Sequence, residues 1–325
     1  MFHIEPKDVT VPEVHRLLLG GVGPRPIALV STISKEGLLN LTPFSFFNAF
    51  GANPPVIAFS PSRRGRNATL KDTYFNLIDN KECVVQSVTY PMVEQISLAS
   101  TEYAPDVDEF IKAGLTPVDS DLVKPKRVKE SPFQMECRLL EMKSFGEGGA
   151  SANIAICEVI KFHIAEDIFR DGIIHPDLID LAARMSANFY CRASGDAVFE
   201  VEKPGLKKGI GYDMLPDFIR NSDIYTGSSL GKLANIEQIP ADEEVTEFIA
   251  GYENKEINSF EPTLEAFYRY LRHRDFEKML KSALELKKQK YRKSKMLFEL
   301  TAKCALEKND IQFAWKTALY VDRED

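Results

Sequence analysis

FQMECRLLEMKSF (133–145) and NIAICEVIKFHIAE (153–166) are two long runs of the strand-forming kind, rich in apolar residues and interrupted by single charged ones. The segment between them, GEGGASA (146–152), consists mainly of small and flexible residues. A flexible link between two extended runs is typical of neighbouring strands that turn back on each other. The sequence therefore predicts an antiparallel strand pair across residues 133–166.

Upstream, the same pattern continues. RPIALVSTIS (25–34) is a β-branched run, and KEG (35–37) supplies a turn in which Gly37 can take a positive φ before LLNLTPFSFFNAFG (38–51) resumes the extended pattern. Further segments are expected as strands or short helices: PVIAFS (55–60) and ECVVQSVTY (82–90) as strands, TLKDTYFNLID (69–79) and MVEQISLAST (92–101) as helices. Many strands without regular strand–helix alternation favour a mainly β, antiparallel barrel over a doubly wound sheet.

The composition changes near residue 205. VEKPGLKKGIGYDMLP (201–216) is rich in Gly, Pro and Lys, and TGSSLGKLANIEQIPADEEVTEF (226–248) is interpreted as a connecting segment. From Pro262 apolar residues recur at helical spacing, first at Leu264, Phe267, Tyr268 and Leu271 and then at Met279, Leu280, Ala283 and Leu284. We expect a β domain at 1–204 and a connecting segment with a helical C-terminal extension at 205–325.

Charge and cysteine content narrow the class of protein. The net charge of −7 and the pI near 5.5 argue against a surface built broadly for nucleic acid. The five cysteines show no CxxC spacing, so we expect neither a disulfide framework nor a metal site, and a reducing cytoplasm fits best. The opening MFHIEPKDVT carries charge where a signal peptide is apolar, and no run predicts a membrane span.

A basic stretch stands out against this acidic background. SPSRRGRNATLKDT (60–73) contains Arg63, Arg64, Arg66 and Lys71. If Asn67, Thr69 or Asp72 caps the helix that follows, the cations meet free backbone N–H groups and the positive end of the helix dipole, which together suit a phosphate. The alternative is a solvated basic loop before a well-capped helix.

The segment before it mixes aromatic and amide side chains. TPFSFFNAFGANPP (42–55) places Ser45, Asn48 and Asn53 among several phenylalanines. A flat apolar ligand could stack there while hydroxyls and amides bind its edge. The alternative is that the phenylalanines belong to the core.

The order of these motifs resembles the flavin reductase-like family, the FMN-binding split barrels. The similarity runs through RPIALVSTISKEGLLNLTPFSFFNAFGANPPVIAFSPSRRGRNATLKDTYFNL, EFIKAGLTPVDSDLVKPKRVKESPFQMECRLLEM and NIAICEVIKFHIAEDIF to YCRAS, roughly residues 20–195. It implies an antiparallel split β-barrel of Greek-key type that forms a homodimer with FMN near the interface. One departure is ARMSANFYCRAS (183–194), where Ser186, Ala187 and Asn188 replace the paired glycines of many relatives, so the substrate or nicotinamide pocket is expected to differ.

The resemblance also implies site residues. The segment matching TPFSFFN would line the flavin ring, and the segment matching FSPSRRGRNATLKDT would hold the ribityl phosphate. Arg63 and Arg66 are left out because one loop can aim only some of its arginines inward. The implied residues are Thr42, Ser45, Phe46, Phe47 and Asn48 for the ring, and Ser60, Arg64, Lys71, Asp72 and Thr73 for the phosphate end.

These implications lead to a function. We expect an oxidoreductase that takes hydride from NADH or NADPH onto FMN and passes electrons to free flavin or another small acceptor, with the flavin supplying the chemistry. His163, in an alternating strand, is a weak candidate for a proton donor, with a structural role as the alternative. GGVGPRP (20–26) has the wrong glycine spacing for a dinucleotide site. The runner-up function is an FMN carrier, sensor or electron-transfer module whose C-terminal tail docks a partner.

Four questions stay open at this point. They are the identity of the electron donor, the identity of the acceptor, the role of residues 205–325, and whether FMN is a prosthetic group or an exchanging substrate. These alternatives share one binding site and differ in affinity and access. Neither property is visible in a sequence.

Overall fold

A computed structural model describes residues 1–201, 205 and 207–321. The chain forms two compact units, Met1–Glu200 and Val201–Asp325. The boundary expected between residues 204 and 205 adjoins residues 202–204, which lie outside the described part. It therefore stays a prediction. Each unit has its own hydrophobic core.

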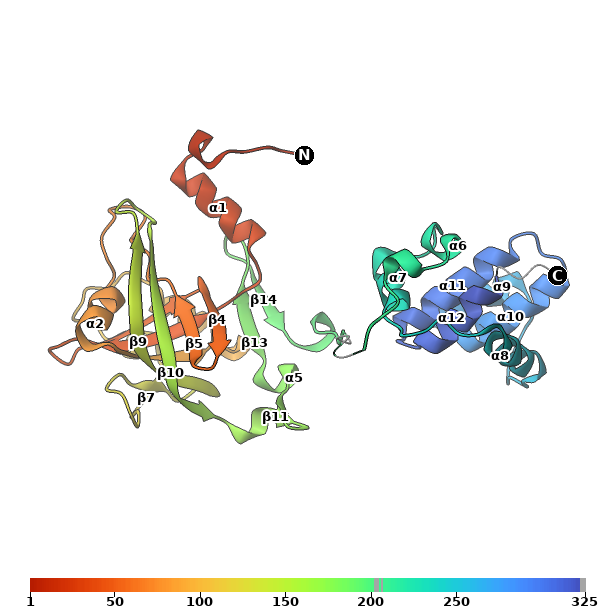
Figure 1. The fold of residues 1–325 in the computed structure, drawn as a ribbon. Coiled ribbons are helices and arrows are strands. Elements are labelled where there is room, and N and C mark those ends of the chain that lie inside the picture. Colours follow the sequence, from red (N-terminus) through yellow and green to blue (C-terminus); the bar gives the residue numbers. More distant parts are fainter. Residues whose placement is uncertain (202–204, 206, 322–325) are drawn as a thin grey trace. The chain divides into compact units, whose positions relative to one another are not determined.

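The first unit is built on a seven-stranded sheet in which every pairing is antiparallel. Its long strand pair is β9 and β10 (Figure 1), which pair from Phe133↔Ile164 to Ala152↔Phe145 and confirm the strand pair predicted across 133–166. In the order in which they lie side by side, the strands are β3 (Leu39–Phe44), β2 (Ala28–Ile33), β6 (Glu82–Ser87), β9 (Phe133–Phe145), β10 (Ala152–Ile164), β5 (Pro55–Phe59) and β4 (Phe47–Ala52).

The side-chain pattern explains the sheet. Along β10, Asn153, Ala155, Cys157 and Val159 are buried while the residues between them are half-exposed, as the two-residue period of a strand requires. The same interior holds Phe59 of β5. One face of the sheet therefore forms the core of the first unit.

The sheet does not close on itself. Among the described strands, no hydrogen-bonded ladder joins the two edges, β3 and β4, although they follow each other in the chain across Ser45 and Phe46. The expectation of one extended run over 38–51 is therefore wrong at this point, because the chain passes here from one edge of the sheet to the other. Pro43, which has no backbone N–H to donate, lies in the edge strand β3, where a proline is tolerated.

The predicted first hairpin is confirmed. β2 and β3 pair antiparallel, and Gly37 in their turn has a φ of +88°. The smaller strands form a three-stranded sheet and two separate pairs. They are β1 (Arg25–Pro26), β13 (Leu181–Arg184) and β14 (Tyr190–Ala193), the pair β7 (Pro117–Val118) and β8 (Arg127–Val128), and the pair β11 (Phe169–Arg170) and β12 (Ile173–Ile174).

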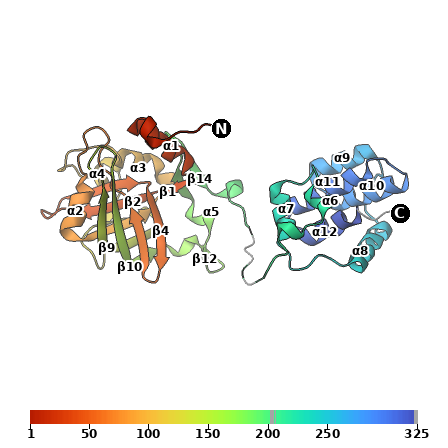
Figure 2. The same ribbon diagram turned by 45° about the horizontal axis from the view of Figure 1, so that its top comes forward.

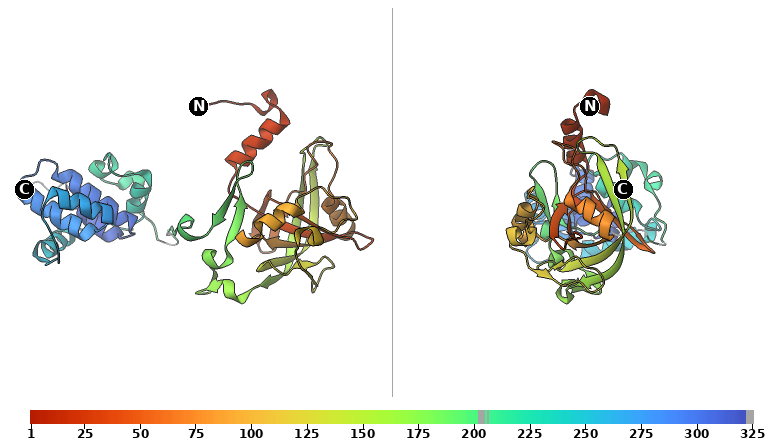
Figure 3. Two further views of the ribbon diagram at one scale, coloured as in Figure 1. Left: turned by 180° about the vertical axis from the view of Figure 1, so that it is seen from behind. Right: turned by 90° about the vertical axis from the view of Figure 1, so that its left-hand side faces the viewer.

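Two of the five α-helices described in this unit match expectation, and three were not predicted. α3 (Val93–Ala99) lies within its predicted range, and α2 (Asp72–Asn80) matches its range but ends one residue later. α1 (Val11–Gly21) was not predicted, although Thr10 and Glu13 form a capping box at its start. None of its residues is buried, and most of the helix projects from the rest of the unit (Figures 1 and 3). Short helices α4 (Glu109–Ala113) and α5 (Pro176–Ile179) complete the unit.

The second unit is helical (Figure 2). Its helices pack on a core that includes Leu233, Phe267, Leu280, Phe298 and Trp315. They are α6 (Asp217–Arg220), α7 (Gly227–Ala234), α8 (Asp242–Asn254), α9 (Leu264–His273), α10 (Phe276–Lys288), α11 (Ser294–Glu307) and α12 (Ile311–Tyr320).

The helices predicted from Pro262 onward are confirmed as α9 and α10, but the interpretation of 226–248 as a connecting segment is wrong. That stretch contains α7 and most of α8, whose Leu230 and Val245 are buried in the helical core. The stretch contains Gly, Ser and Pro residues, which are typical of linkers. The apolar residues that it contributes to the two helices, however, lie on their buried face. Across the described residues, no helix is long and apolar enough to cross a membrane.

Candidate functional site

The basic loop between β5 and α2 is fixed to the tip of the β9–β10 hairpin. Arg63 N–H donates to Ser151 O at 3.0 Å, and the Asn153 side chain donates to Pro61 O at 3.2 Å. Gly149 comes so close to Gly65 that a Cβ there would lie 3.1 Å from the Gly65 carbonyl carbon. The loop's course is therefore set by the hairpin that the sequence predicts most clearly.

Four of the expected site residues meet in a small polar pocket of about 20 Å³. Thr42 comes from β3, Arg64 from the basic loop, and Lys71 and Asp72 from the start of α2. The other residues that line it are Asn40, Ser100, Thr101, Glu102, Tyr103 and Glu109.

Arg64 is held mainly by its own loop. Its side chain is 19% exposed, and its guanidinium donates to the Leu70 carbonyl oxygen. It also lies 3.5 Å from Asp72 Oδ2 and 3.9 Å from Glu102 Oε1. These are long ion pairs, so the guanidinium keeps capacity for a further anion.

Lys71 is the less satisfied of the two cations. Its half-buried ammonium makes no hydrogen bond or ion pair within the described part of the chain, and its one ring contact is with Phe44, whose centroid is 5.9 Å away. Burial and the charge of Arg64 lower the pKa of Lys71. The negative charge of a bound anion would offset both effects.

The start of α2 adds free backbone donors beside Lys71. Lys71 is the N-cap residue and makes no capping hydrogen bond, so the expectation that Asn67, Thr69 or Asp72 caps this helix is wrong. Asn67 instead accepts from Thr69, and Asp72 lies within the first turn. An uncapped helix start of this kind fits a phosphate group.

Acidic side chains border the same pocket. Glu109 is 8% exposed and accepts hydrogen bonds from Leu41 N–H at 3.0 Å and from the Asn40 side chain at 3.1 Å. Burial raises the pKa of Glu109 despite these bonds. Asp72 and Glu102 partly neutralise the pocket, which leaves Lys71 as its unpaired cation.

A second, apolar pocket of about 330 Å³ adjoins the start of the basic loop. One side is the α1 face formed by Val11, Val14, His15 and Leu18, and Phe46 and Ser60 lie in the same lining. The His15 and Phe46 rings meet edge to face with centroids 6.2 Å apart. Apolar walls with a few hydroxyl groups suit a flat ring.

The remaining expected residues lie elsewhere. Thr73 is fully buried and donates its hydroxyl to Asn40 Oδ1 at 2.8 Å, and Phe47 packs against the sheet core. The exposed Asn48 accepts from Ala49 N–H at 2.9 Å. Among the described residues, the lining of the two pockets includes neither these three residues nor Ser45. Their expected role at the flavin stays a prediction.

The arginines left out of the site also have defined places. Arg63 donates to Ala68 O at 2.9 Å, within its own loop, while Arg66 is exposed. Neither lines the polar pocket as described.

The sequence did not predict every segment that lines the two pockets. Ser100 to Tyr103 follow α3, and their polar run was visible but had no assigned use. The α1 face was also readable, because Val11, Val14 and Leu18 recur at helical spacing behind the Thr10 and Glu13 capping pair. The approach of these segments to the basic loop depends on tertiary packing.

His163 is tied to a buried carboxylate. Its Nε2 lies 2.6 Å from Oε1 of Glu136, which also accepts from the backbone N–H groups of Asp121, Leu122 and Val123 at 2.8, 2.6 and 3.1 Å. Asp121, Glu136 and His163 could approach a metal ion, but Glu136 already has a full set of donors. Neither described pocket includes His163 in its lining, so the geometry favours its structural role.

The departure at Ser186–Asn188 forms the turn between β13 and β14. Ala187 has a φ of +47°, and Met185 N–H donates to Phe189 O at 2.9 Å. A Cβ on Gly20 of α1 would lie 3.8 Å from the Cβ of Ser186. The turn therefore packs beside the C-terminal end of α1, and its effect on a substrate pocket stays a prediction.

Comparison with known sequences now places the chain. It matches the family described as "Flavin reductase like domain" over residues 21–181. An uncharacterized protein of Aquifex aeolicus (strain VF5) is 36% identical over 196 residues, which are 60% of this chain and 97% of that protein. This chain belongs to the flavin reductase-like family. The uncharacterized protein BH2278 of Halalkalibacterium halodurans is 34% identical and covers 63% of this chain and 98% of its own length.

Solved structures agree with this assignment. Nitrilotriacetate monooxygenase component B from Bacillus cereus superposes with a TM-score of 0.58 at 33% identity, covering 62% of this chain and 98% of its own. The 2-nitrobenzoate 2-nitroreductase NbaA of Pseudomonas fluorescens superposes with a TM-score of 0.55 at 26% identity and covers 62% and 96%. The resemblance to the flavin reductase-like family is thus confirmed, and the family match lies entirely within the first unit.

Proposed function

We propose that this protein is an FMN-binding oxidoreductase that takes hydride from NADH or NADPH and passes electrons to free flavin or another small acceptor. The observation that carries the proposal is the half-buried Lys71 ammonium, which has no ion-pair partner in the described chain and lies at the uncapped start of α2. Family membership supports a flavin as the ligand. When bound, FMN would supply the hydride-accepting chemistry.

The protein's own residues would bind and orient the flavin. Lys71 and Arg64 would hold the phosphate, with α2 N–H groups as further donors. Thr42 on β3 lines the same pocket and offers a hydroxyl. Phe46 and Ser60 would meet the ring, and the α1 face would exclude water from it.

The proposed function is tested with an absorbance spectrum of the purified protein, with and without added FMN, followed by NADH or NADPH under anaerobic conditions. A bound flavin band that bleaches on addition of one nucleotide supports the reductase and names its donor. A protein that fails to bind FMN contradicts the proposal at its first step. Bound FMN that neither nucleotide reduces contradicts the hydride step alone.

A second candidate, an FMN carrier, sensor or electron-transfer module, is favoured by the helical unit. This unit, with its own core, lies outside the family match at residues 21–181. A partner protein could dock there and exchange electrons with the flavin. Efficient steady-state turnover of NADH or NADPH by the isolated chain would exclude this candidate.

We also propose that the first unit forms a homodimer. Large apolar side chains are exposed on it, including Phe50 at 69%, Ile173 at 61% and Phe189 at 69%. Phe50 belongs to the edge strand β4, where an unpaired row of backbone groups adds to the apolar surface. Light scattering on the wild type should give twice the mass of one chain, and Phe50→Asp should shift it toward one chain.

A further inference from the structure

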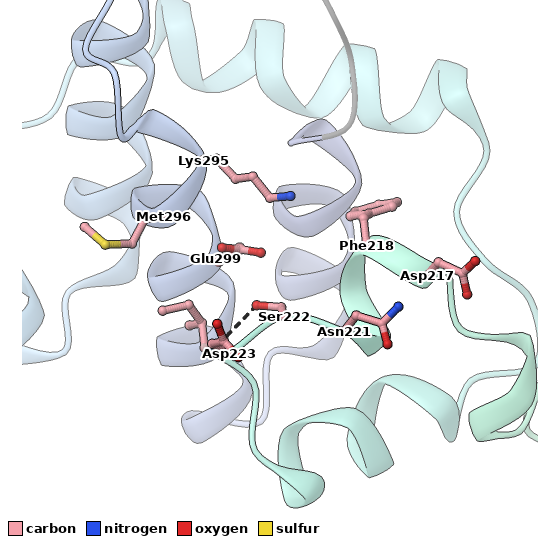
Figure 4. Close-up of a pocket in the computed structure, with 9 residues that line it drawn as sticks. Asp217, Phe218, Asn221, Ser222, Asp223, Lys295, Met296 and Glu299 are labelled. Atoms are coloured by element: carbon pink, nitrogen blue, oxygen red, sulfur yellow. Dashed lines mark hydrogen bonds between the residues drawn. The ribbon is translucent and has the colours of Figure 1, made fainter.

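The helical unit contains a groove of about 580 Å³ between α6 with the residues that follow it and the first half of α11 (Figure 4). It belongs wholly to the second unit, outside the match to the flavin reductase-like family. Its contents therefore concern a function separate from flavin binding.

The decisive residue of this groove is Glu299. Its side chain is 7% exposed and points into the groove beneath Lys295 (Figure 4). Within the described part of the chain its carboxylate makes no hydrogen bond or ion pair. This carboxylate is therefore available as an acceptor for a donor group brought into the groove.

Nearby Tyr225 reports the same electrostatic environment. Its hydroxyl is buried without a hydrogen-bond partner in the described chain. Burial and the charge of Glu299 raise the pKa of Tyr225 above its ordinary value. Tyr225 and Glu299 therefore lie close enough to interact electrostatically.

The rest of the lining gives an excess of negative charge. Asp217 is paired with Arg220, whereas the exposed Asp223 has no ion pair among the described residues. Lys295 is the cation of the lining (Figure 4), and among the described residues it forms no ion pair with Glu299. Besides the paired Asp217, the lining therefore contains two carboxylates, Asp223 and Glu299, and one ammonium group, that of Lys295.

Apolar side chains lie beside these charges. Phe218, Ile224 and Met296 are half-buried in the same lining. Methylene stems of lysine and arginine pack on such surfaces while their charged ends reach a carboxylate. From this combination we propose that the groove binds a lysine or arginine side chain presented by a partner polypeptide, with Glu299 as its counter-ion.

A polypeptide fits this site better than a free amine. The rim residues Asn221, Asp223 and Lys295 are exposed, so a small amine would leave much of its own surface in water. Residues flanking a basic side chain would cover the rim and add contacts.

The proposal is tested on the full chain with defined probes. A fluorescein-labelled peptide of alternating Lys and Leu is titrated by anisotropy at low and high salt, beside the same peptide with Gln in place of Lys. Unlabelled spermidine serves as the free-amine competitor. The expected result is salt-dependent binding of the Lys peptide, at least tenfold weaker binding of the Gln peptide, and poor displacement by spermidine.

Matched variants locate the site. Glu299→Gln should weaken binding of the Lys peptide at least tenfold, while Glu265→Gln, the same change at an exposed position of α9, should leave it unchanged. Lys295→Gln should strengthen binding because it removes the competing cation. Fluorescence of Trp315, the one tryptophan of the chain, verifies that each variant keeps the helical core folded.

Several results would overturn the proposal. They are equal binding by Glu299→Gln and Glu265→Gln, equal binding of the Lys and Gln peptides, or no salt-dependent binding of the Lys peptide at millimolar concentration. Tight binding of spermidine that depends on Glu299, without peptide binding, would assign the groove to small amines instead. Flavin binding is not involved in any of these outcomes, so they are independent of the proposed reductase function.

Discussion

Gly149, at the tip of the β9–β10 hairpin, lies directly against Gly65 of the basic loop, so that a methyl group on Gly149 would collide with the Gly65 carbonyl oxygen. Two backbone segments approach closely here because neither residue carries a side chain. The contact joins the clearest strand pair of the sequence to the loop that carries Arg64. The position of the proposed phosphate site thus depends on a glycine far from it in the chain.

Gly149→Ala should therefore displace the basic loop. We expect a loss of stability of about 1 to 3 kcal/mol, the usual cost of overpacking, together with weaker FMN binding. Gly148→Ala is the matched control, because the nearest atom to a Cβ there, Ser151 Oγ, is 3.9 Å away. Equal FMN affinity in the two variants, measured by fluorescence quenching, would show that the loop does not depend on this contact.

Removal of the two pocket cations should weaken FMN binding directly. Lys71→Ala and Arg64→Ala each delete a charge-assisted contact to the phosphate, for a loss of about 1.5 to 3 kcal/mol per variant. Arg66→Ala removes the same kind of charge from an exposed position of the same loop and should change the affinity little. Riboflavin, which lacks the phosphate, should bind wild type and variants alike. If Arg66→Ala weakened FMN binding as much as the other two variants do, general electrostatic attraction rather than a specific phosphate site would explain the loss.

The lowered pKa of Lys71 predicts a pH dependence of FMN binding. Burial, together with the charge of Arg64, favours the neutral amine in the free protein, and the bound phosphate favours the ammonium. Affinity should therefore fall as the pH rises from neutral toward the pKa of the free protein's Lys71. Lys71→Arg keeps its charge throughout that range and should show a flatter profile between pH 7 and pH 9.5. Parallel profiles in the two proteins would mean that Lys71 does not contact the phosphate.

Much of the first unit was predictable because its strands carry local signals. The β9–β10 pair and the turn at Gly37 were found from alternation and turn residues alone. The break at Ser45 and Phe46 was not, because the residues on both sides favour extended structure and the change of sheet edge is a tertiary event. Similarly, α8 buries only Val245 and Ile249, so its helical period is weak in sequence, whereas the period of α7 was present and was overlooked.

For the site, the sequence identified the cations but not their surroundings. Lys71 and Arg64 were found from charge and from family resemblance, and both line the polar pocket. Glu109 could not be assigned, because its contact with Leu41 joins residues far apart in the chain. The expected capping at Asn67, Thr69 or Asp72 failed because Asn67 bonds Thr69 within the loop and leaves the helix start open.

The buried Glu136 should be a major stabilising residue of the first unit. It accepts hydrogen bonds from His163 and from three consecutive backbone N–H groups, beginning at Asp121. Burial opposes its charge, but these bonds outweigh burial and hold the pKa of Glu136 below its ordinary value. The resulting stabilisation is present above the carboxyl's unfolded-state pKa and is lost as the pH falls through the lower folded-state value.

Glu136→Gln should therefore reduce the free energy of unfolding by about 3 kcal/mol at pH 7, and by much less in acid, because its amide cannot accept from every donor. Glu141→Gln, on the exposed part of the same strand, makes the same chemical change without these partners and should cost little. Urea unfolding followed by circular dichroism measures the loss, while the fluorescence of Trp315 follows the helical unit separately. If Glu136→Gln retained full stability at pH 7 but lost reductase activity, His163 and Glu136 would belong to the chemistry rather than to the fold.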